Sequence, residues 1–167
     1  MERKSESNLA NRFANELGKS ENKLENRLEN KKLNDRDLVV LLKEKIRNEK
    51  ALTLEVVNLI REVENRRIYL AMGFGSLFDF VTKELGYEES AAVRRISAAR
   101  LIREIPEIEN KIANAELNLT NLSMAQSFFR REEKLRDEKL TRSEKKSILE
   151  KIENKSTRET QKVFLEI

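Results

Sequence analysis

Arginines recur in the segment between Gly73 and Pro106 with a spacing that suits contact with nucleic acid. They are Arg94, Arg95, Arg100 and Arg103. A guanidinium donates paired hydrogen bonds to phosphate oxygens or to the edge of guanine. Residues four apart share a helix face, so Ser90 and Arg94 are expected to face outward, next to Arg95. The sequence thus predicts a nucleic-acid surface made of Ser90, Arg94 and Arg95, supported by Arg100.

Two helices joined by a glycine turn are expected to position these arginines. Ser76 with Asp79 has the pattern of a helix start, and Gly86 follows the predicted helix as glycine commonly does. A second helix is predicted from Glu88 to Ile105. Short helices joined this way can present the second one to a DNA groove. The segment Ser76–Ile105 is therefore predicted to be a helix-turn-helix-like unit.

The same residues also suit a plain helical corner, and this alternative stays open. The arginines would then be solvated or paired with Glu88, Glu89 or Glu104. A second basic group, Arg66 and Arg67, ends a predicted helix, where cations stabilise the negative end of the helix dipole. These two arginines are candidate phosphate contacts as well.

The remainder of the chain predicts helices only, so the expected fold is all-α. Apolar residues recur at helical spacing from Asp35 onward. Helices are expected over 35–48 and 53–72, separate or fused, and over 106–115, 120–134, 141–153 and from 156 to the end. Thr141 with Glu144, and Ser156 with Glu159, are capping-box pairs. An aromatic core nucleus is expected around the glycines, made of Tyr69, Phe74, Phe78, Phe80 and Tyr87.

Residues 1–34 form an arm of biased composition, followed by a helical domain at 35–167. The arm is rich in asparagine, a weak helix former, so its helix is expected to be marginal. Its apolar residues form a thin seam: Leu9, Phe13, Leu17, Leu24 and Leu28. The arm is predicted either to be disordered or to join copies of the chain as a homo-oligomer, because asparagine can set the register of such seams.

Composition argues against catalysis. The chain has no histidine and no cysteine, which excludes a His base, a Cys nucleophile, a Cys/His zinc site and a disulfide. Carboxylates are interleaved with lysine and arginine, so no metal, no cofactor and no catalytic residue is predicted, and the protein is expected not to be an enzyme. No apolar stretch resembles a signal peptide or a membrane span, and a cytoplasmic location is expected. The net charge is +4 and the pI about 9.3, compatible with a polyanionic partner.

Three stretches resemble the helical N-terminal region of a group of bacterial HNH endonucleases. They are RRIYLAMGFGSLFDFVTKELGYEESAAVRRISAARLIREIPEIENKI, LNLTNLSMAQSFF and ILEKIENKSTRETQKVFL. The resemblance covers about Arg66 to Ile167. In that group the helical region precedes an HNH nuclease module, which this sequence lacks, so the resemblance implies DNA engagement without cleavage. A looser resemblance joins the glycine-turn helix pair to plasmid-partition DNA-binding proteins.

The favoured prediction is therefore a non-catalytic DNA-binding protein that uses the unit Ser76–Ile105. The alternative is a helical protein-interaction or oligomerisation module that binds no nucleic acid.

Overall fold

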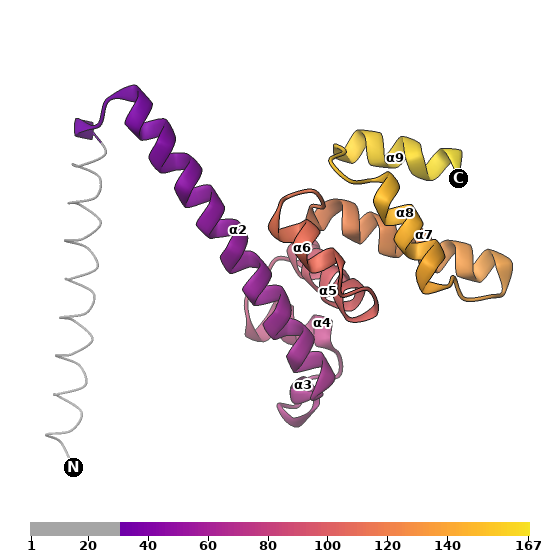
Figure 1. Cartoon of the computed structure of the whole chain (residues 1–167). Coiled ribbons are helices and arrows are strands. Elements are labelled where there is room, and N and C mark those ends of the chain that lie inside the picture. Colours follow the sequence, from indigo (N-terminus) through magenta and orange to yellow (C-terminus); the bar gives the residue numbers. More distant parts are fainter. Residues whose placement is uncertain (1–30) are drawn as a thin grey trace, which may run out of the picture. The chain divides into compact units, whose positions relative to one another are not determined.

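The computed structural model describes residues 31–167, and every regular element in that range is a helix (Figure 1). The prediction of an all-α fold is confirmed. The elements are α2 (Asp35–Asn65), α3 (Ile68–Ala71), α4 (Leu77–Asp79), the π-helical turn η1 (Phe80–Glu84), α5 (Glu89–Glu104), α6 (Ile108–Ala113), α7 (Leu119–Arg136), α8 (Arg142–Lys151) and α9 (Thr157–Glu166). Among these residues, no helix combines the length and apolarity needed to span a membrane.

The chain divides into two compact units, Met1–Asn48 and Glu49–Ile167, and the boundary falls within α2. The second unit, called the body below, contains the end of α2 and all later helices. The apolar seam predicted between Leu9 and Leu28 lies outside the described residues. The predicted domain boundary at residue 34, and the arm before it, therefore stay predictions.

The two helices expected over 35–48 and 53–72 are fused into one continuous helix, α2, which ends at Asn65 and not at Met72. Asn34 accepts a hydrogen bond from the amide of Asp37 at 3.0 Å at its start. The chain leaves the helix after Asn65 because Arg67 adopts a left-handed conformation, φ 52°. The single turn α3 and a bond from the Phe74 amide to the Tyr69 carbonyl follow. The expected continuation to Met72 is thus wrong, and the break lets Tyr69 and Phe74 pack against the core.

Side chains start the other helices largely as the sequence predicts. The Ser76 hydroxyl accepts from the Asp79 amide at 3.0 Å and begins α4. Gly86 has φ 71° in the turn before α5, a conformation that side chains disfavour. Both predicted capping boxes, at Thr141 with Glu144 and at Ser156 with Glu159, are present. These caps satisfy backbone donors that a helix start otherwise leaves unpaired.

Two helices begin at different residues from those predicted. Ile105 is extended, with φ −133° and ψ 79°, because the residue before a proline avoids the helical region. Pro106 then lies in a turn, and α6 starts only at Ile108. Helix α7 begins at Leu119, one residue before the predicted start at Thr120, because the side chain of Asn118 caps it by accepting the amide of Asn121 at 2.8 Å.

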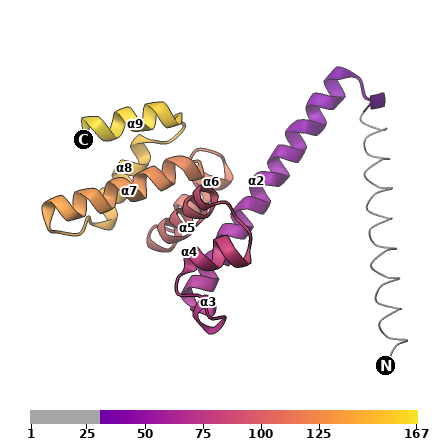
Figure 2. The same ribbon diagram turned by 180° about the vertical axis from the view of Figure 1, so that it is seen from behind.

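Helix α5 is the centre of the body. Its main neighbour is α7, and it also packs against α4, η1 and α6 (Figure 2). Along α5, Ala92, Ala98 and Ala99 have no exposed surface, and neither have the larger Leu101 and Ile102. Small side chains let the neighbouring helices come close, and the larger ones fill the space around the second half. Helix α5 is therefore enclosed by other helices on more than one side.

The prediction of an aromatic core nucleus is correct except at Phe78. Phe80 is buried, and Tyr69, Phe74 and Tyr87 pack partly buried against the core. Phe74 and Phe80 meet edge to face with ring centroids 5.5 Å apart. Phe78, in contrast, is 37% exposed. It lies on α4 next to the buried Leu77, so the two neighbours project to different sides of the short helix.

We predict that Ile102→Ala lowers the free energy of unfolding by about 2–5 kcal/mol, because it leaves a cavity around a side chain with no exposed surface. Urea unfolding followed by circular dichroism measures the change. The matched control is Leu135→Ala on α7, whose side chain is 73% exposed and whose loss is expected to change stability by less than about 0.5 kcal/mol. Equal effects of the two changes would contradict the placement of α5 at the core.

Candidate interaction surface around α5 and α7

The start of α5 carries the residues first predicted to contact nucleic acid. Ser90 is exposed and its hydroxyl donates to a carboxylate oxygen of Glu88 at 2.5 Å. Arg94, one turn later, donates to the Ser90 hydroxyl at 3.0 Å. Arg94 is half-buried, and in residues 31–167 no carboxylate lies within ion-pair distance of it. Ser90 and Arg94 therefore share one helix face, as expected, and they form a polar chain with Glu88.

Glu88 occupies the helix end that a phosphate would otherwise use. Its carboxylate accepts the amides of Ser90 at 3.1 Å and Ala91 at 3.2 Å. The Ser90 hydroxyl, these amides and the positive charge of Arg94 lower the pKa of the Glu88 carboxyl below its ordinary value. The free N–H groups and positive dipole that make a helix start an anion site are therefore already engaged by an anion of this chain.

Arg95 is held by an aromatic ring instead of projecting freely. Its guanidinium carbon lies 4.3 Å from the centre of the Tyr87 ring. One guanidinium nitrogen donates to the Ala91 carbonyl at 3.2 Å, and Nε is buried. Stacking on an aromatic face stabilises an arginine and restricts its movement. Arg95 thus closes the turn before α5, a role that the sequence did not predict.

Arg100 and Arg103 both bind Glu64 near the end of α2. Arg100 donates to one Glu64 oxygen at 2.9 and 2.8 Å, and Arg103 donates to the other at 3.2 Å. The Glu64 side chain is only 13% exposed. These ion pairs tie α5 to α2 within the body. Because Arg100 has a carboxylate partner here, a phosphate would have to compete with Glu64 for it.

The second predicted basic group is divided by the end of α2. Arg66 pairs with Glu62 at 2.5 Å, and both side chains remain largely solvated. Arg67 is exposed in its left-handed turn, and no ion pair forms there among the described residues. The two arginines therefore do not act as one paired clamp in this conformation.

A groove along one side of α7 lies next to these residues, and we call it the α7 groove. It consists of two shallow depressions of about 470 and 380 Å³ that share Ser123 and Met124. The first is lined by Phe78, Glu88, Glu89, Ser90, Val93, Arg94 and Thr120, the second by Ser127, Phe128, Arg131 and Phe164. The α7 residues in this set recur three or four apart, so they share one helix face.

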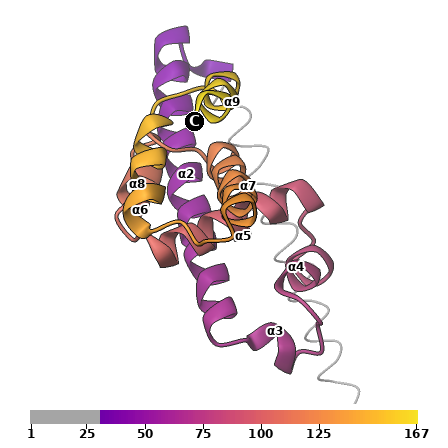
Figure 3. The same cartoon turned by 90° about the vertical axis from the view of Figure 1, so that its right-hand side faces the viewer.

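The lining of the α7 groove is apolar in the middle and charged at the ends. Val93 is 43% exposed, and Met124 is half-buried. Phe128 stacks on Phe164 of α9 with centroids 4.8 Å apart, and α9 packs beside α7 (Figure 3). Glu89 and Glu88 stand at the end near Thr120, and Arg131 stands at the other, with its guanidinium 5.3 Å from the Phe128 ring.

The sequence alone did not reveal this groove. Met124 and Phe128 lie four residues apart on the same face of α7, a spacing typical of core residues, and Phe128 is buried. Their spacing does not show that Met124 is only half-buried, because its exposure depends on where α4 and α9 end. The feature of the sequence that could have indicated the groove is the pair Phe78 and Val93, because both are apolar residues close to the polar start of α5.

In the part of the chain that the structure describes, no three carboxylates gather in a way that could hold a metal ion. Comparison with protein-family models, with curated proteins and with solved structures finds no match to this chain.

We predict that the amide resonances of Ser90 and Ala91 shift as Glu88 is protonated, with a midpoint below the ordinary glutamate pKa of about 4.3. Because the folded pKa is lowered, the cap is intact above the unfolded value and is lost as the pH falls through the folded one. An NMR titration from pH 6 to pH 2.5 measures it.

The control variant is Glu88→Gln, in which this transition is expected to disappear while the other carboxylates still titrate. A midpoint at or above the ordinary value, or an unchanged titration in Glu88→Gln, would show that Glu88 does not cap α5 in solution.

Proposed function

We propose that this protein is a non-catalytic helical interaction module that binds an amphipathic helix of a partner protein in the α7 groove. The observation that supports this best is the pair of adjoining depressions along α7, walled by α4, α5 and α9, in which Phe78 and Val93 are exposed and Met124 is half-buried. Exposed contiguous apolar surface rimmed by charge is typical of protein-binding sites. This is the alternative function predicted from the sequence, now attached to particular residues.

The shape of the groove suits a helix. The α7 residues that line it run from Thr120 to Arg131, which corresponds to about 16 Å or three helical turns. A helix lying along it would place apolar residues at i, i+3 or i+4, and i+7 toward Met124 and the aromatic rings. The flexible side chain of methionine adapts to such ligands.

The charges at the two ends define the partner further. Glu88 and Glu89 at the Thr120 end favour basic residues on the docked helix, and Arg131 at the other end favours an acidic residue. Glu88 stays ionised at neutral pH because its pKa is lowered. The same two glutamates repel phosphate, so they support a protein partner over a nucleic acid at this groove.

We predict that peptides selected from a random phage-displayed library on the full chain, with counter-selection on Met124→Glu, carry apolar residues at helical spacing, basic residues at one end and an acidic residue at the other. A labelled selected peptide is expected to bind Met124→Glu at least about tenfold more weakly, since a carboxylate replaces apolar contact area. Fluorescence anisotropy measures the affinities.

Leu135→Glu is the matched control, because Leu135 lies on the same helix, is 73% exposed and is outside the groove. It should leave peptide affinity unchanged. Selected peptides that bind the wild type and Met124→Glu equally, or that share a proline-rich or extended pattern, would refute the α7 groove as a helix site.

DNA binding through the unit Ser76–Ile105 is the second candidate. One observation favours it: Arg94, half-buried on the first half of α5, has no carboxylate within ion-pair distance among the described residues. Arg67 is exposed as well. A helix-turn-helix role and the resemblance to the helical region of HNH endonucleases stay predictions, as does a cytoplasmic location. Ser90, Arg95, Arg100 and Arg66 contribute less under this hypothesis, because each already has a partner in the chain.

For this candidate we predict that the chain retards a labelled duplex of random sequence at low salt and that affinity falls steeply with salt concentration. Arg94→Ala is expected to reduce the slope of log affinity against log salt by about 1, the loss of one phosphate contact. An electrophoretic titration at two salt concentrations measures both.

Arg130→Ala is the comparison, since Arg130 is an exposed arginine on a different helix. Absence of retardation at low salt would exclude DNA binding. Equal slopes for the wild type and Arg94→Ala would exclude α5 as the contact, and neither result would affect the α7 groove.

A further inference from the structure

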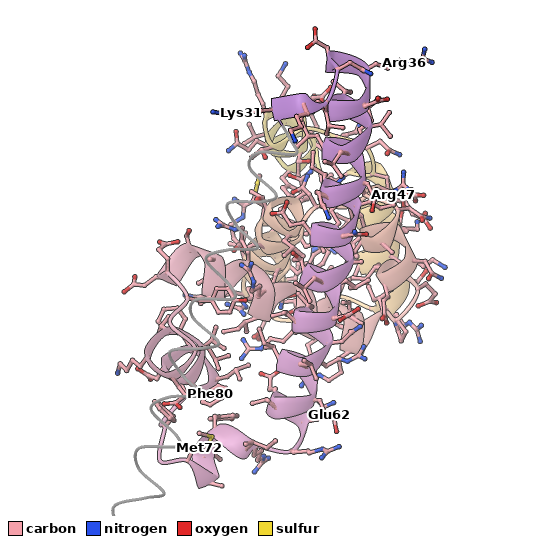
Figure 4. The ribbon with its side chains drawn as sticks, turned by 90° about the vertical axis from the view of Figure 1, so that its left-hand side faces the viewer. Lys31, Arg36, Arg47, Glu62, Met72 and Phe80 are labelled. Atoms are coloured by element: carbon pink, nitrogen blue, oxygen red, sulfur yellow. The ribbon has the colours of Figure 1, made fainter. Side chains whose placement is uncertain are left out.

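The turn that contains α3, between α2 and α4, exposes two large apolar side chains at one end of the body. Leu70 is 48% exposed and Met72 is 49% exposed. Figure 4 shows Met72 at the lower end of the body, beyond Phe80 and the last turns of α2. We call residues 66–73 the α3 turn. Exposed apolar side chains that lie together in this way are typical of a surface that binds a partner.

Backbone hydrogen bonds define the shape of the α3 turn. The amide of Gly73 donates to the Leu70 carbonyl at 3.0 Å, and the amide of Phe74 donates to the Tyr69 carbonyl at 2.9 Å. Gly73 has φ 86°, a conformation that ends helices and that glycine adopts without strain. Tyr69 and Phe74 pack against the core. The same turn therefore directs two aromatic side chains inward and leaves Leu70 and Met72 in solvent.

Positive charge accompanies these apolar side chains. The sequence from Asn65 to Phe78 contains Arg66 and Arg67 and no acidic residue. Arg67 is exposed and forms no ion pair among the described residues. The carboxylates that flank this stretch are all paired with basic side chains: Glu62 with Arg66, Glu64 with Arg100 and Arg103, and Asp79 with Lys83. Because Glu64 has two basic partners and Arg67 has no acidic one, the surface around the α3 turn is positively charged.

The combination of exposed apolar side chains with positive charge suits the surface of an anionic lipid bilayer. Leucine and methionine leave water when they enter the region between the headgroups and the acyl chains. An arginine beside them stays at the level of the headgroups, where anionic lipids attract it. The phosphates of a nucleic acid would attract Arg67 as well, but they would leave Leu70 and Met72 in water. Contact of this kind needs no helix that spans the membrane.

We propose that the α3 turn binds the surface of an anionic lipid bilayer, with Leu70 and Met72 inserted beside the headgroups and Arg67 against lipid phosphates. Two apolar side chains and one unpaired cation give weak and reversible binding. This surface is separate from the α7 groove, which is lined by residues of α4, α5, α7 and α9 and of the cap of α5.

Tryptophan fluorescence tests the insertion in the full-length chain, and the natural absence of tryptophan makes the probe specific. The emission of Leu70→Trp is expected to shift to shorter wavelength with vesicles of equal parts phosphatidylcholine and phosphatidylglycerol, and not with phosphatidylcholine alone. The matched control is Leu135→Trp on α7, at a position that is 73% exposed, and its emission is expected to stay unchanged with both vesicles.

Co-sedimentation with the same vesicles tests which side chains bind. The double variant Leu70→Ser/Met72→Ser is expected to bind the mixed vesicles at least about tenfold more weakly, because it removes the apolar contact. Arg67→Glu reverses one charge and is expected to weaken binding about tenfold or more. Leu135→Ser is the control and should bind as the wild type does. All four positions are exposed, and circular dichroism checks that each variant keeps its helix content.

Three results would overturn the proposal. One is a wild-type chain that does not bind the mixed vesicles at about 1 mM lipid. Another is full binding by Leu70→Ser/Met72→Ser, which would assign the attraction to another surface. The third is a shift of Leu70→Trp emission that grows with protein concentration without lipid, which would assign the α3 turn to a second copy of the chain. Because Met124→Glu and Arg94→Ala leave the α3 turn untouched, failure here and failure of either proposed function are separate outcomes.

Discussion

The close packing of α5 constrains the rest of the body. Ala92, Ala98 and Ala99 have no exposed surface, and Leu101, Ile102 and Ile105 fill the space around the second half of the helix. A helix enclosed in this way cannot expose many polar side chains, because burying a charge without a partner is costly. Each arginine of α5 must therefore reach solvent at the edge of the packed region or find a partner within the fold.

That constraint explains the partners of the arginines. Arg100 and Arg103 emerge beside α2, where both pair with the largely buried Glu64. Arg95 emerges beside the turn that precedes α5 and lies on Tyr87. The first turns of α5 reach open surface as well, and there Glu88 serves as an anionic cap. The part of α5 that is free to bind a ligand is thus short, and its charge is mixed.

Sequence patterns predicted what depends on neighbours along the chain. Helix caps at Ser76, Thr141 and Ser156 and the left-handed turn at Gly86 follow from residues within four positions of one another. Features that depend on distant residues were not predictable. The Glu64–Arg100 pair joins residues 36 apart, and the exposure of Phe78 depends on which side of α4 meets the core. The predicted nucleic-acid surface required arginines that project into solvent. Which arginines do so depends on contacts with residues that are distant in the sequence.

The distribution of exposed leucine bears on why α2 is built as it is. Nearly half of the large apolar side chains exposed in residues 31–167 lie on α2. Helix propensity does not require them, since alanine, lysine and glutamate form helices as well as leucine does and keep the surface soluble. The exposed ones do not keep one spacing; they are Leu38, Val39, Val40, Leu42, Ile46, Leu52 and Leu59. Packing among the described residues therefore does not account for the apolar side chains that α2 leaves open, and contiguous apolar surface of this kind is typical of a face that a partner covers.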